Sequence, residues 1–499
     1  MKRESGILLH ISSLPSRYHI GSLGKEAYNF VDFLKKAKQS YWQLLPFGHT
    51  GYGDSPYQTF SVFAGNPYFI DLDLLVEDNL LTKDEVMSHR DNKEEFVDYG
   101  HLFNTRIPLL KKAYKRGFDP NNEDYRIFLE QNVFWVHDYA FYFALKEHYN
   151  YAPVQEWPIG IRARQSDYMH SLGILLEETI NFYRYIQFLF YTQFRALKKY
   201  ANDNGIKIFG DTPIYASPDS ADVWAMPQNF RLNHEFKPTV VAGVPPDYFS
   251  ETGQLWGNPL YNWDFQKQDN YYWWRMRIEH MSRMLDALRI DHFRALHTYF
   301  SVPYGEETAR NGNWEIGPGM EFINLMKESF PNLQIIAEDL GDLDDSVLDF
   351  IKETGLPGMR VLQFAFDHPD SPYLPHNHEI NSVLYTGTHD NDTLSSWLKS
   401  DTDSVKIAKE YFDFDEYDDD NFRVVRWGMS SICRIFIAPI QDYLGQSGKY
   451  RMNTPGTSSG NWQYRVVSGQ LSDSLAEKIA DLTVLYGRAA DFACDLSDD

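Results

Sequence analysis

The chain has 499 residues, of which 16% are aromatic, and carries a formal net charge of −23. This charge argues against nucleic acid and anionic membrane surfaces as partners, because both require basic patches on the protein. No segment reaches the ~20 apolar residues of a membrane span, and the N-terminal apolar run is too short for a secretory signal. Cys433 and Cys494 are not expected to form a disulfide. We therefore expect a cytoplasmic protein that acts on a neutral or cationic substrate.

Helical and strand-like segments alternate along the chain, as is typical of a parallel sheet with crossover helices. A strand is predicted in GILLHI, and a helix over 27–38 precedes a strand in YWQLLPF. A helix with apolar residues over 182–197, with Gly205 as its expected C-cap, precedes the strand IKIFGD. Another helical stripe over 274–288 precedes the strand RIDHF. The remaining strands are predicted in LQIIAED, MRVLQFAFD, VLYTGTHD and CRIFIAPI.

Eight candidate strands indicate an α/β protein with a closed (β/α)8 TIM barrel. The alternative is a doubly wound open sheet, which would bind its ligand at one switch point instead of drawing acids from several strand ends. We predict a single barrel over 1–499, with a mainly helical subdomain inserted at about 60–180 between strands 2 and 3. A second insertion is predicted at about 220–268, where the Gly, Pro and aromatic residues of 245–261 indicate a long functional loop.

Three acidic residues follow apolar runs: Asp291 in LRIDHFR, Glu338 in LQIIAEDLG and Asp390 in VLYTGTHDND. A parallel strand that stops on an acid delivers its carboxylate to the mouth of a barrel, where catalytic groups collect. Two such acids suffice for the chemistry of a glycosidic bond. Taken singly, each acid is equally well explained as the N-cap of a following helix. The combination is what favours a catalytic site.

The neighbours of these acids predict different charge states for them. Arg289 lies two residues before Asp291, so both face the same side of a strand, and the cation keeps Asp291 ionised as a nucleophile. Glu338 follows the apolar IIA, where desolvation raises a carboxyl pKa and suits a general acid. Asp390, beside His389, is expected to bind sugar hydroxyls and to stabilise a developing positive charge.

Longer strings across nearly the whole chain resemble the 4-α-glucanotransferases, or amylomaltases, of glycoside hydrolase family 77. They are SSLPS at 12–16, GDSPYQ at 53–58, GDTPIY at 210–215, PPDYFSETGQLWGNPLY at 245–261, RIDHFR, AEDLG, GTHDN, and RMNTPGT with NWQYR near the C-terminus. The resemblance implies a (β/α)8 barrel with inserted helical subdomains. It also implies transfer of an α-1,4-glucan segment to the 4-hydroxyl of glucose or another glucan. One departure is Tyr215, where many relatives carry Phe.

The same resemblance implies that Asp291 is the nucleophile, Glu338 the general acid/base and Asp390 the transition-state stabiliser of a retaining double displacement. The residues implied to contact sugar are Ser55, Tyr57, Asp211, Gln254, Trp256, Arg289, His389, Asp367 and Asn453. It implies no metal or other cofactor. The expected partners are a glucan donor and a glucose or maltooligosaccharide acceptor, and we expect a monomer or weak homo-oligomer. Structural interpretations stay open: Tyr57 in the core, Trp256 as a loop anchor and Asn453 as a turn residue.

Transfer must compete with hydrolysis, which requires a dry acceptor site. We expect the loop over 245–261 to form a lid, with Tyr248, Phe249 and Trp256 excluding water. The alternative enzyme is an amylase-like hydrolase with the same carboxylates, and the alternative outside enzymes is a catalytically silent glucan-binding protein. Reducing ends distinguish the three, because transfer conserves them, hydrolysis creates them and a binder leaves both them and chain lengths unchanged.

Overall fold

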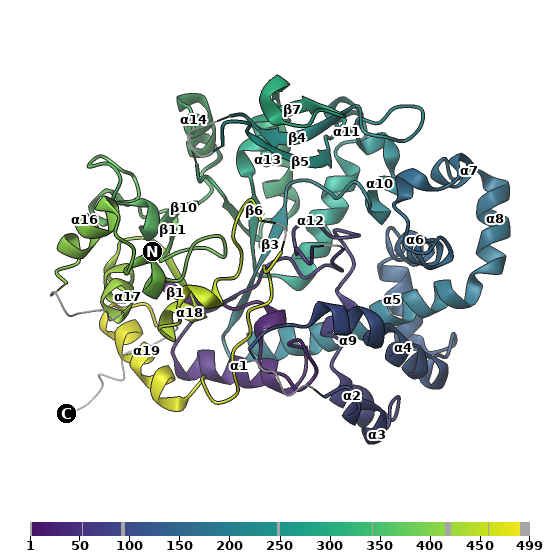
Figure 1. Cartoon of the computed structure of the whole chain (residues 1–499), viewed down its shortest axis with the longest axis horizontal. Coiled ribbons are helices and arrows are strands. Elements are labelled where there is room, and N and C mark those ends of the chain that lie inside the picture. Colours follow the sequence, from purple (N-terminus) through teal and green to yellow (C-terminus); the bar gives the residue numbers. More distant parts are fainter. Residues whose placement is uncertain are drawn as a thin grey trace.

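The computed structural model describes residues 2–51, 53–90, 95–246, 250–341, 343–414, 421–457 and 459–489. Eight parallel strands form a barrel in the spatial order β10-β11-β12-β1-β2-β3-β6-β9, with helices around it (Figure 1). Each of the eight predicted strand segments overlaps one barrel strand, so the predicted TIM barrel is confirmed. The strands are β1 (Glu4–Leu8), β2 (Tyr41–Gln43), β3 (Lys207–Pro213), β6 (Ala287–Asp291), β9 (Gln334–Ala337), β10 (Gly358–Val361), β11 (Ser382–Tyr385) and β12 (Ile435–Pro439).

The seam between β9 and β10 is closed by a backbone hydrogen bond, from the N–H of Ala337 to the carbonyl of Pro357 at 2.9 Å, and by a side chain. Within the described residues, the other neighbouring barrel strands are joined by parallel ladders. At this seam the carboxylate of Asp339 accepts the backbone N–H of Met359 at 2.5 Å and pairs with Arg360 at 3.1 Å. Gly358 leaves room for that carboxylate, because a Cβ there would lie 2.3 Å from its oxygen. A carboxylate therefore does the work of a ladder hydrogen bond directly after Glu338.

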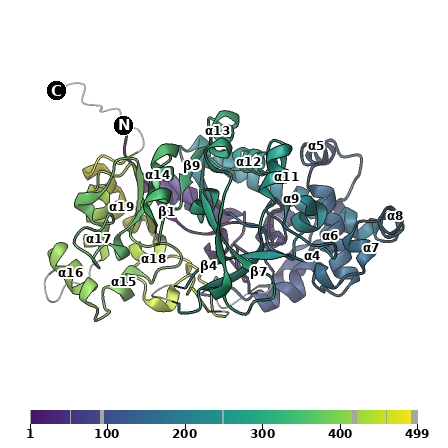
Figure 2. The same cartoon turned by 90° about the horizontal axis from the view of Figure 1, so that it is seen from above.

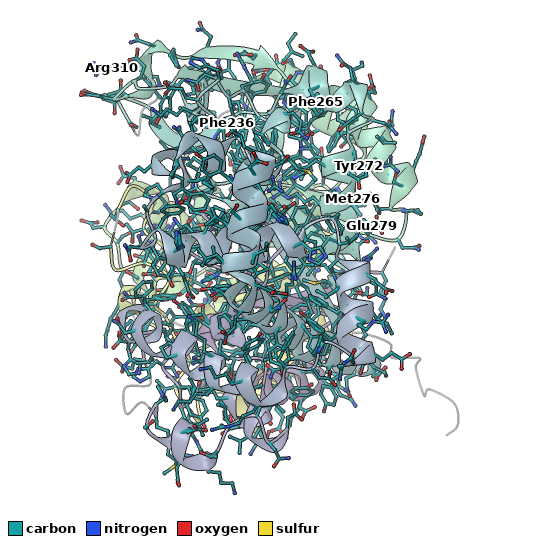
Figure 3. All side chains as sticks on the ribbon, turned by 90° about the vertical axis from the view of Figure 1, so that its right-hand side faces the viewer. Phe236, Phe265, Tyr272, Met276, Glu279 and Arg310 are labelled. Carbon is teal, nitrogen blue, oxygen red and sulfur yellow. The ribbon has the colours of Figure 1, made fainter. Side chains whose placement is uncertain are left out.

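The predicted helices are present as α1 (Lys25–Lys36), α9 (Glu177–Asp203) and α12 (Tyr272–Met284). Gly205 follows the C-cap of α9 in a left-handed conformation, with φ of 77°. The helix predicted over 274–288 extends too far, because α12 ends at Met284 and residues 287–291 form strand β6. In α12, Trp274 and Ile278 face the core, whereas Tyr272, Met276 and Glu279 form the outer face (Figure 3). This is the amphipathic pattern from which the helix is predicted.

Helices fill the long interval between β2 and β3. They lie on one side of the barrel, and α16, α17 and α19 lie on the other (Figures 1 and 2). The long helix α9 contacts α6 of this group as well as α1 and β3 of the barrel, so it connects the two parts. The boundaries at about 60–180 stay a prediction. The helices of this group are α2 (Leu72–Glu77), α3 (Lys83–Met87), α4 (Tyr99–Gly117), α5 (Glu123–Gln131), α6 (Val136–His148), α7 (Ile159–Arg162), α8 (Ser166–Leu175) and α9.

A small antiparallel sheet accompanies the barrel, with the order β5-β4-β7-β8. Its strands are β4 (Val240–Val244), β5 (Gln254–Pro259), β7 (Thr298–Pro303) and β8 (Asn313–Ile316). The prediction that 245–261 is a loop is therefore wrong over 254–259. The strand β5 lies at the edge of its sheet and pairs irregularly with β4, and an edge position tolerates the Gly and Pro that favoured a loop. Tyr248 and Phe249 lie outside the described residues.

The boundaries of the second predicted insertion, at about 220–268, also remain a prediction. It contains α10 (Ala221–Ala225), β4, β5 and α11 (Trp263–Gln268). The helices that follow β8 are α13 (Gly319–Ser329), α14 (Asp345–Thr354), α15 (Leu394–Trp397), α16 (Asp403–Tyr411), α17 (Asn421–Ser430), α18 (Ile440–Tyr443) and α19 (Asp473–Leu485).

Within the described part of the chain, no helix is both long and apolar enough to cross a membrane. Among the same residues, no three His, Cys, Asp or Glu side chains are grouped so that they could hold a metal ion. Cys433 is buried with a free thiol, and Cys494 lies outside the described residues.

Candidate active site

Two of the three predicted carboxylates emerge from neighbouring strands. The strands β6 and β9 pair in parallel, with Ile290 opposite Ala337. Asp291 is the last residue of β6 and Glu338 directly follows β9, so both side chains lie at the carboxyl ends of adjacent strands. The backbone N–H of Glu338 donates to the carbonyl oxygen of Ile290 at 3.2 Å, which fixes the step between them. The barrel therefore places the two acids side by side at its mouth.

Arg289 holds carboxylates from two strands. One guanidinium nitrogen donates to both oxygens of Asp211 at 2.9 and 2.7 Å, and the other pairs with Asp291 at 2.8 Å. Asp211 stands opposite Arg289 in the ladder between β3 and β6. Burial raises the pKa of the Asp211 carboxyl, and the guanidinium opposes that shift. The predicted contact between Arg289 and Asp291 is thus present, and Asp211 anchors the arginine from beneath.

Glu338 is held in a desolvated position. Its carboxyl oxygens accept the backbone N–H groups of His292 at 2.6 Å and Leu340 at 2.9 Å. The left-handed conformation of His292, with φ of 55°, follows directly after Asp291. Burial and the negative charge of Asp291 raise the pKa of Glu338 to about 7, against the opposing effects of Arg289 and the two N–H donors. The predicted upward shift is therefore confirmed.

Asp390 does not end a strand. The strand β11 stops at Tyr385, and Asp390 lies on the loop that follows, so the predicted strand-end position is wrong for this acid. The reason is local, because Thr388 and Asn391 form a tight turn that leaves the sheet. Asn453 donates to the Asp390 carboxylate at 2.6 Å. Although burial favours the neutral form, His389 and Asn453 outweigh it and hold the pKa of Asp390 below its usual value.

Two aromatic rings, those of Tyr57 and Trp462, lie against His389. Its imidazole stacks on Tyr57 with ring centroids 5.0 Å apart, and Trp462 lies 5.8 Å from Tyr57 and 5.7 Å from His389. The hydroxyl of Tyr57 donates to Asp211 at 2.8 Å. Tyr57 is half-buried and packs against the hydrophobic core, and its hydroxyl reaches Asp211 at the site. Burial opposes protonation of His389, but the charge of Asp390 raises its pKa.

The predicted sugar contacts on the edge strand β5 lie near Glu338. The ring of Trp256 meets His292 edge to face at 4.8 Å, and its Nε1–H donates to Gln254 at 3.1 Å. Gln254 itself is exposed. Tyr215 is buried beside these residues, and its ring centroid lies 6.4 Å from those of both Trp256 and His292. Its aromatic ring therefore serves packing.

The remaining predicted residues differ in position. The Oγ of Ser55 accepts the backbone N–H of Tyr57 at 3.3 Å, so it orients that ring. Asn453 points at Asp390. Asp367 is exposed, and no hydrogen bond or ion pair among the described residues joins it to the three carboxylates. The structure thus brings Ser55 and Asn453 to the site and leaves Asp367 outside this network.

Trp462 and Arg451 belong to this network but carry no role in the sequence analysis. The guanidinium of Arg451 donates to the backbone carbonyls of Asp390 and Asn453, the latter at 2.7 Å. Both residues lie within or beside the strings RMNTPGT and NWQYR. The two strings that contain these residues could be recognised in the sequence. Their contact with the loop of Asp390 could not be predicted, because about 60 or more residues separate them from Asp390 along the chain.

The sequence was compared with protein families and with known proteins. A sequence profile of the 4-alpha-glucanotransferase family matches residues 9–470. The chain is 47% identical to the 4-alpha-glucanotransferase of Clostridium butyricum over 486 residues, covering 96% of this chain and 100% of that protein. It is 42% identical to that of Thermus thermophilus over 486 residues, covering 95% and 96%.

The fold agrees with these relatives. The amylomaltase from Streptococcus agalactiae, solved in complex with acarbose, superposes with a TM-score of 0.95 at 40% identity, covering 98% of this chain and 100% of that one. A hydrolase or a silent binder is not favoured by this pattern of relatives. The chain therefore belongs to the 4-alpha-glucanotransferase family, the amylomaltases, and is an enzyme that transfers segments of α-1,4-glucans.

Proposed function

We propose that this chain transfers glucan segments by a retaining double displacement, with Asp291 as nucleophile, Glu338 as general acid/base and Asp390 as transition-state stabiliser. The main support for this proposal is that the two adjacent acids have different electrostatic surroundings. Asp291 is paired with the buried Arg289 at 2.8 Å, whereas the pKa of Glu338 is raised to about 7. A retaining mechanism needs one ionised and one protonated carboxyl group about 5 Å apart.

In the first step Glu338 gives its proton to the scissile oxygen while Asp291 attacks the anomeric carbon. The bond from that carbon to the leaving glucan breaks, and a glycosyl ester with Asp291 forms. Esterification removes the charge of Asp291, which is one of the causes that raise the pKa of Glu338. The pKa of Glu338 then falls, and the residue becomes the base that the second step requires.

In the second step Glu338 takes the proton of an acceptor 4-hydroxyl as its oxygen attacks the anomeric carbon. The ester bond breaks, Asp291 leaves as a carboxylate, and the α-linkage is restored on a new chain. The ionised Asp390 offsets the positive charge that develops on the sugar ring in both steps. Tyr57, His389, Arg289 and Asp211 are proposed to hold the donor sugar, with Ser55 and Asn453 supporting them.

The strand β5 is proposed as part of the acceptor side. Gln254 and Trp256 lie beside His292, whose backbone holds Glu338, so an acceptor resting on the Trp256 ring would reach the acid/base. Trp256→Ala should raise hydrolysis relative to transfer, because the acceptor site loses its dry face. Total reducing ends and chain lengths, followed together, measure this ratio, and an unchanged ratio contradicts the proposal. Asp367 is proposed only as a distant glucan contact.

An activated donor separates the two acids. Fluoride leaves without a proton, so Glu338→Gln should lose transfer from maltotriose by about 10²–10⁴-fold but still cleave α-maltosyl fluoride. A maltosyl ester on the protein should then appear by intact mass spectrometry. Asp291→Asn should lose both reactions and carry no ester. An equal loss on both donors in the Glu338 variant, or an ester on the Asp291 variant, contradicts these roles.

The natural reaction is followed with maltotriose alone. We expect glucose and longer maltodextrins at constant total reducing ends, with acceptors from glucose upward. We also propose that the protein acts in the cytoplasm as a monomer or weak homo-oligomer. Support for this comes from its two cysteines and its formal net charge of −23, which disfavours self-association. Sedimentation velocity tests the oligomeric state, and a stable dimer contradicts it.

A further inference from the structure

His389 and Asp390 lie on the segment 386–394, whose middle is bonded to Asn453, Arg451 and Gln363 through the backbone carbonyls of His389, Asp390 and Asp392. The segment 386–394 leaves the sheet after β11 and continues as α15. Its tip is a turn in which Asn391 Oδ1 accepts the backbone N–H of Thr388 at 2.8 Å and its hydroxyl at 2.9 Å. The backbone N–H of Asp390 donates to the hydroxyl of Thr388 at 3.2 Å. These bonds shape the turn, but they do not fix it relative to Asp291.

One buried carboxylate binds both ends of this segment. Asp442 is 1% exposed, and Thr386 and Leu394 are fully buried. One oxygen of Asp442 accepts the hydroxyl of Thr386 at 2.5 Å, and the other accepts the backbone N–H of Leu394 at 2.8 Å. The first bond lies directly after β11, and the second lies at the first residue of α15. The two ends of 386–394 are therefore held against the same side chain.

The position of Asp442 is itself fixed by the barrel. Asp442 lies on α18, which directly follows β12, and β12 pairs in parallel with β11, with Tyr385 opposite Ile437. The backbone carbonyl of Asp442 accepts the side-chain amide of Asn421 at 3.0 Å. No hydrogen bond within the described residues joins Asp442 to His389 or Asp390. The two hydrogen bonds of the Asp442 carboxylate link it to His389 and Asp390 through the segment 386–394.

We propose that Asp442 is a positioning residue for glucan transfer, which sets the place of His389 and Asp390 at the barrel mouth by clamping both ends of 386–394. The proposal rests on the role proposed above for Asp390. A catalytic group displaced by about 1 Å can cost about 10²-fold in rate, even when the altered residue is far from the reacting atoms. A carboxylate that satisfies two buried donors is also costly to remove, because both donors then lose their acceptor.

The hydrogen bonds of Asp442 predict how strongly each substitution lowers kcat. Asparagine at 442 can still accept the Leu394 N–H through its oxygen, and its amide can donate to Thr386, whose hydroxyl turns around to accept. Asp442→Asn should therefore keep most of kcat. Asp442→Ala and Thr386→Val should lower kcat for transfer by about 10-fold or more, with a smaller change in KM. In the Thr386→Val background, Asp442→Asn should become harmful, because its amide has no acceptor.

A matched control separates clamping from general loss of stability. Thr354 is also fully buried and donates its hydroxyl to the carbonyl of Ile351 at 2.6 Å, at the end of α14. The Thr354 hydroxyl also accepts the backbone N–H of Leu356 at 3.1 Å, so Thr354→Val should lower the melting temperature at least as much as Thr386→Val but leave kcat unchanged. If Asp442→Ala does not fold, Thr386→Val still tests the proposal. Equal kcat in the Thr386 and Thr354 variants would overturn it.

A double-mutant cycle tests whether Asp442 acts through Asp390. Transfer from α-maltosyl fluoride to glucose is measured for Asp442→Ala, Asp390→Asn and the double variant. If the clamp serves mainly to place Asp390, the double variant should be no more than about 2-fold slower than Asp390→Asn alone. Fully additive losses would overturn the proposal that the clamp acts through Asp390. Full activity of Asp390→Asn would instead refute the role proposed for Asp390, so the two failures are distinguishable.

Discussion

Arg289 shows how much a single side chain contributes to this site. Its guanidinium is 5% exposed and bonds to carboxylates on two neighbouring strands. Because the guanidinium is a planar fork, it can bond to both oxygens of Asp211 and to one of Asp291 together. A lysine ammonium is a compact point charge and lacks the fixed fork that spaces these three bonds. The two aspartates therefore depend on the shape of this cation as well as on its charge.

Arg289→Lys should fold but lose both activity and stability. We expect kcat/KM to fall by about 10²-fold or more, because Asp291 is no longer oriented. The melting temperature should also fall, because the buried Asp211 keeps a weaker partner. Arg289→Met should be less stable still, since it leaves Asp211 without any cation. A lysine variant with full activity would contradict the orienting role.

The raised pKa of Glu338 predicts a specific dependence of stability on pH. In the folded chain this carboxyl keeps its proton up to about pH 7, whereas its ordinary pKa is 4.5. The folded state therefore binds more protons than the unfolded state between these values, so this group makes folding less favourable as pH rises through the window. Glutamine has one acceptor oxygen and loses one of the two bonds to the His292 and Leu340 N–H groups, so Glu338→Gln should start below the wild-type melting temperature near pH 4.5 and gain on it up to pH 8. An equal difference at both values would contradict the shift.

Asp390 provides a control of opposite sign. Its pKa lies below the ordinary value of 3.8, so its ionised form stabilises the folded state above that pH and the gain is lost as pH falls through the folded pKa. Asp390→Asn should therefore be less stable than the wild type at pH 8, where Glu338→Gln shows its largest gain relative to the wild type. Melting curves of the three proteins in the same buffers distinguish the two effects.

At the level of elements, β9 and β10 are the neighbouring barrel strands that no parallel ladder joins within the described residues. Asp339 replaces ladder bonds at this seam, and it directly follows Glu338 in the chain. Any shift of the Asp339 carboxylate therefore also moves the acid/base. The seam thus couples closure of the sheet to the geometry of catalysis.

Gly358→Ala should disturb both closure and catalysis. The new methyl would lie 2.3 Å from the Asp339 carboxylate, and overpacking of this kind costs about 1–3 kcal/mol. We expect a lower melting temperature and a lower kcat. The matched control is Gly173→Ala in α8, where the nearest atom would be 3.9 Å away and alanine favours the helix. A Gly358 variant as stable and active as that control would contradict the importance of the seam.

At the level of the whole molecule, the fold was largely predictable from the sequence and the site was predictable in part. The eight barrel strands are short buried runs that end in turns or acids. This pattern can be recognised in a single sequence without an alignment. The strand β5 was missed because its Gly and Pro are tolerated only at a sheet edge, which local sequence does not reveal. The rings and amides around Asp390, such as Trp462 and Asn453, come from distant segments, so only the folded chain brings them together.

The barrel also has a consequence for how the chain is made. The first strand, β1, has β12 as one of its two neighbours, with Glu4 opposite Ile435 and Leu8 opposite Pro439. Synthesis at about 5–20 residues per second leaves roughly 20 to 90 s between these two segments. Until then β1 has an open edge, and the sheet cannot close around Arg289. The catalytic mouth is thus assembled only in the last part of translation, whatever the order in which its helices form.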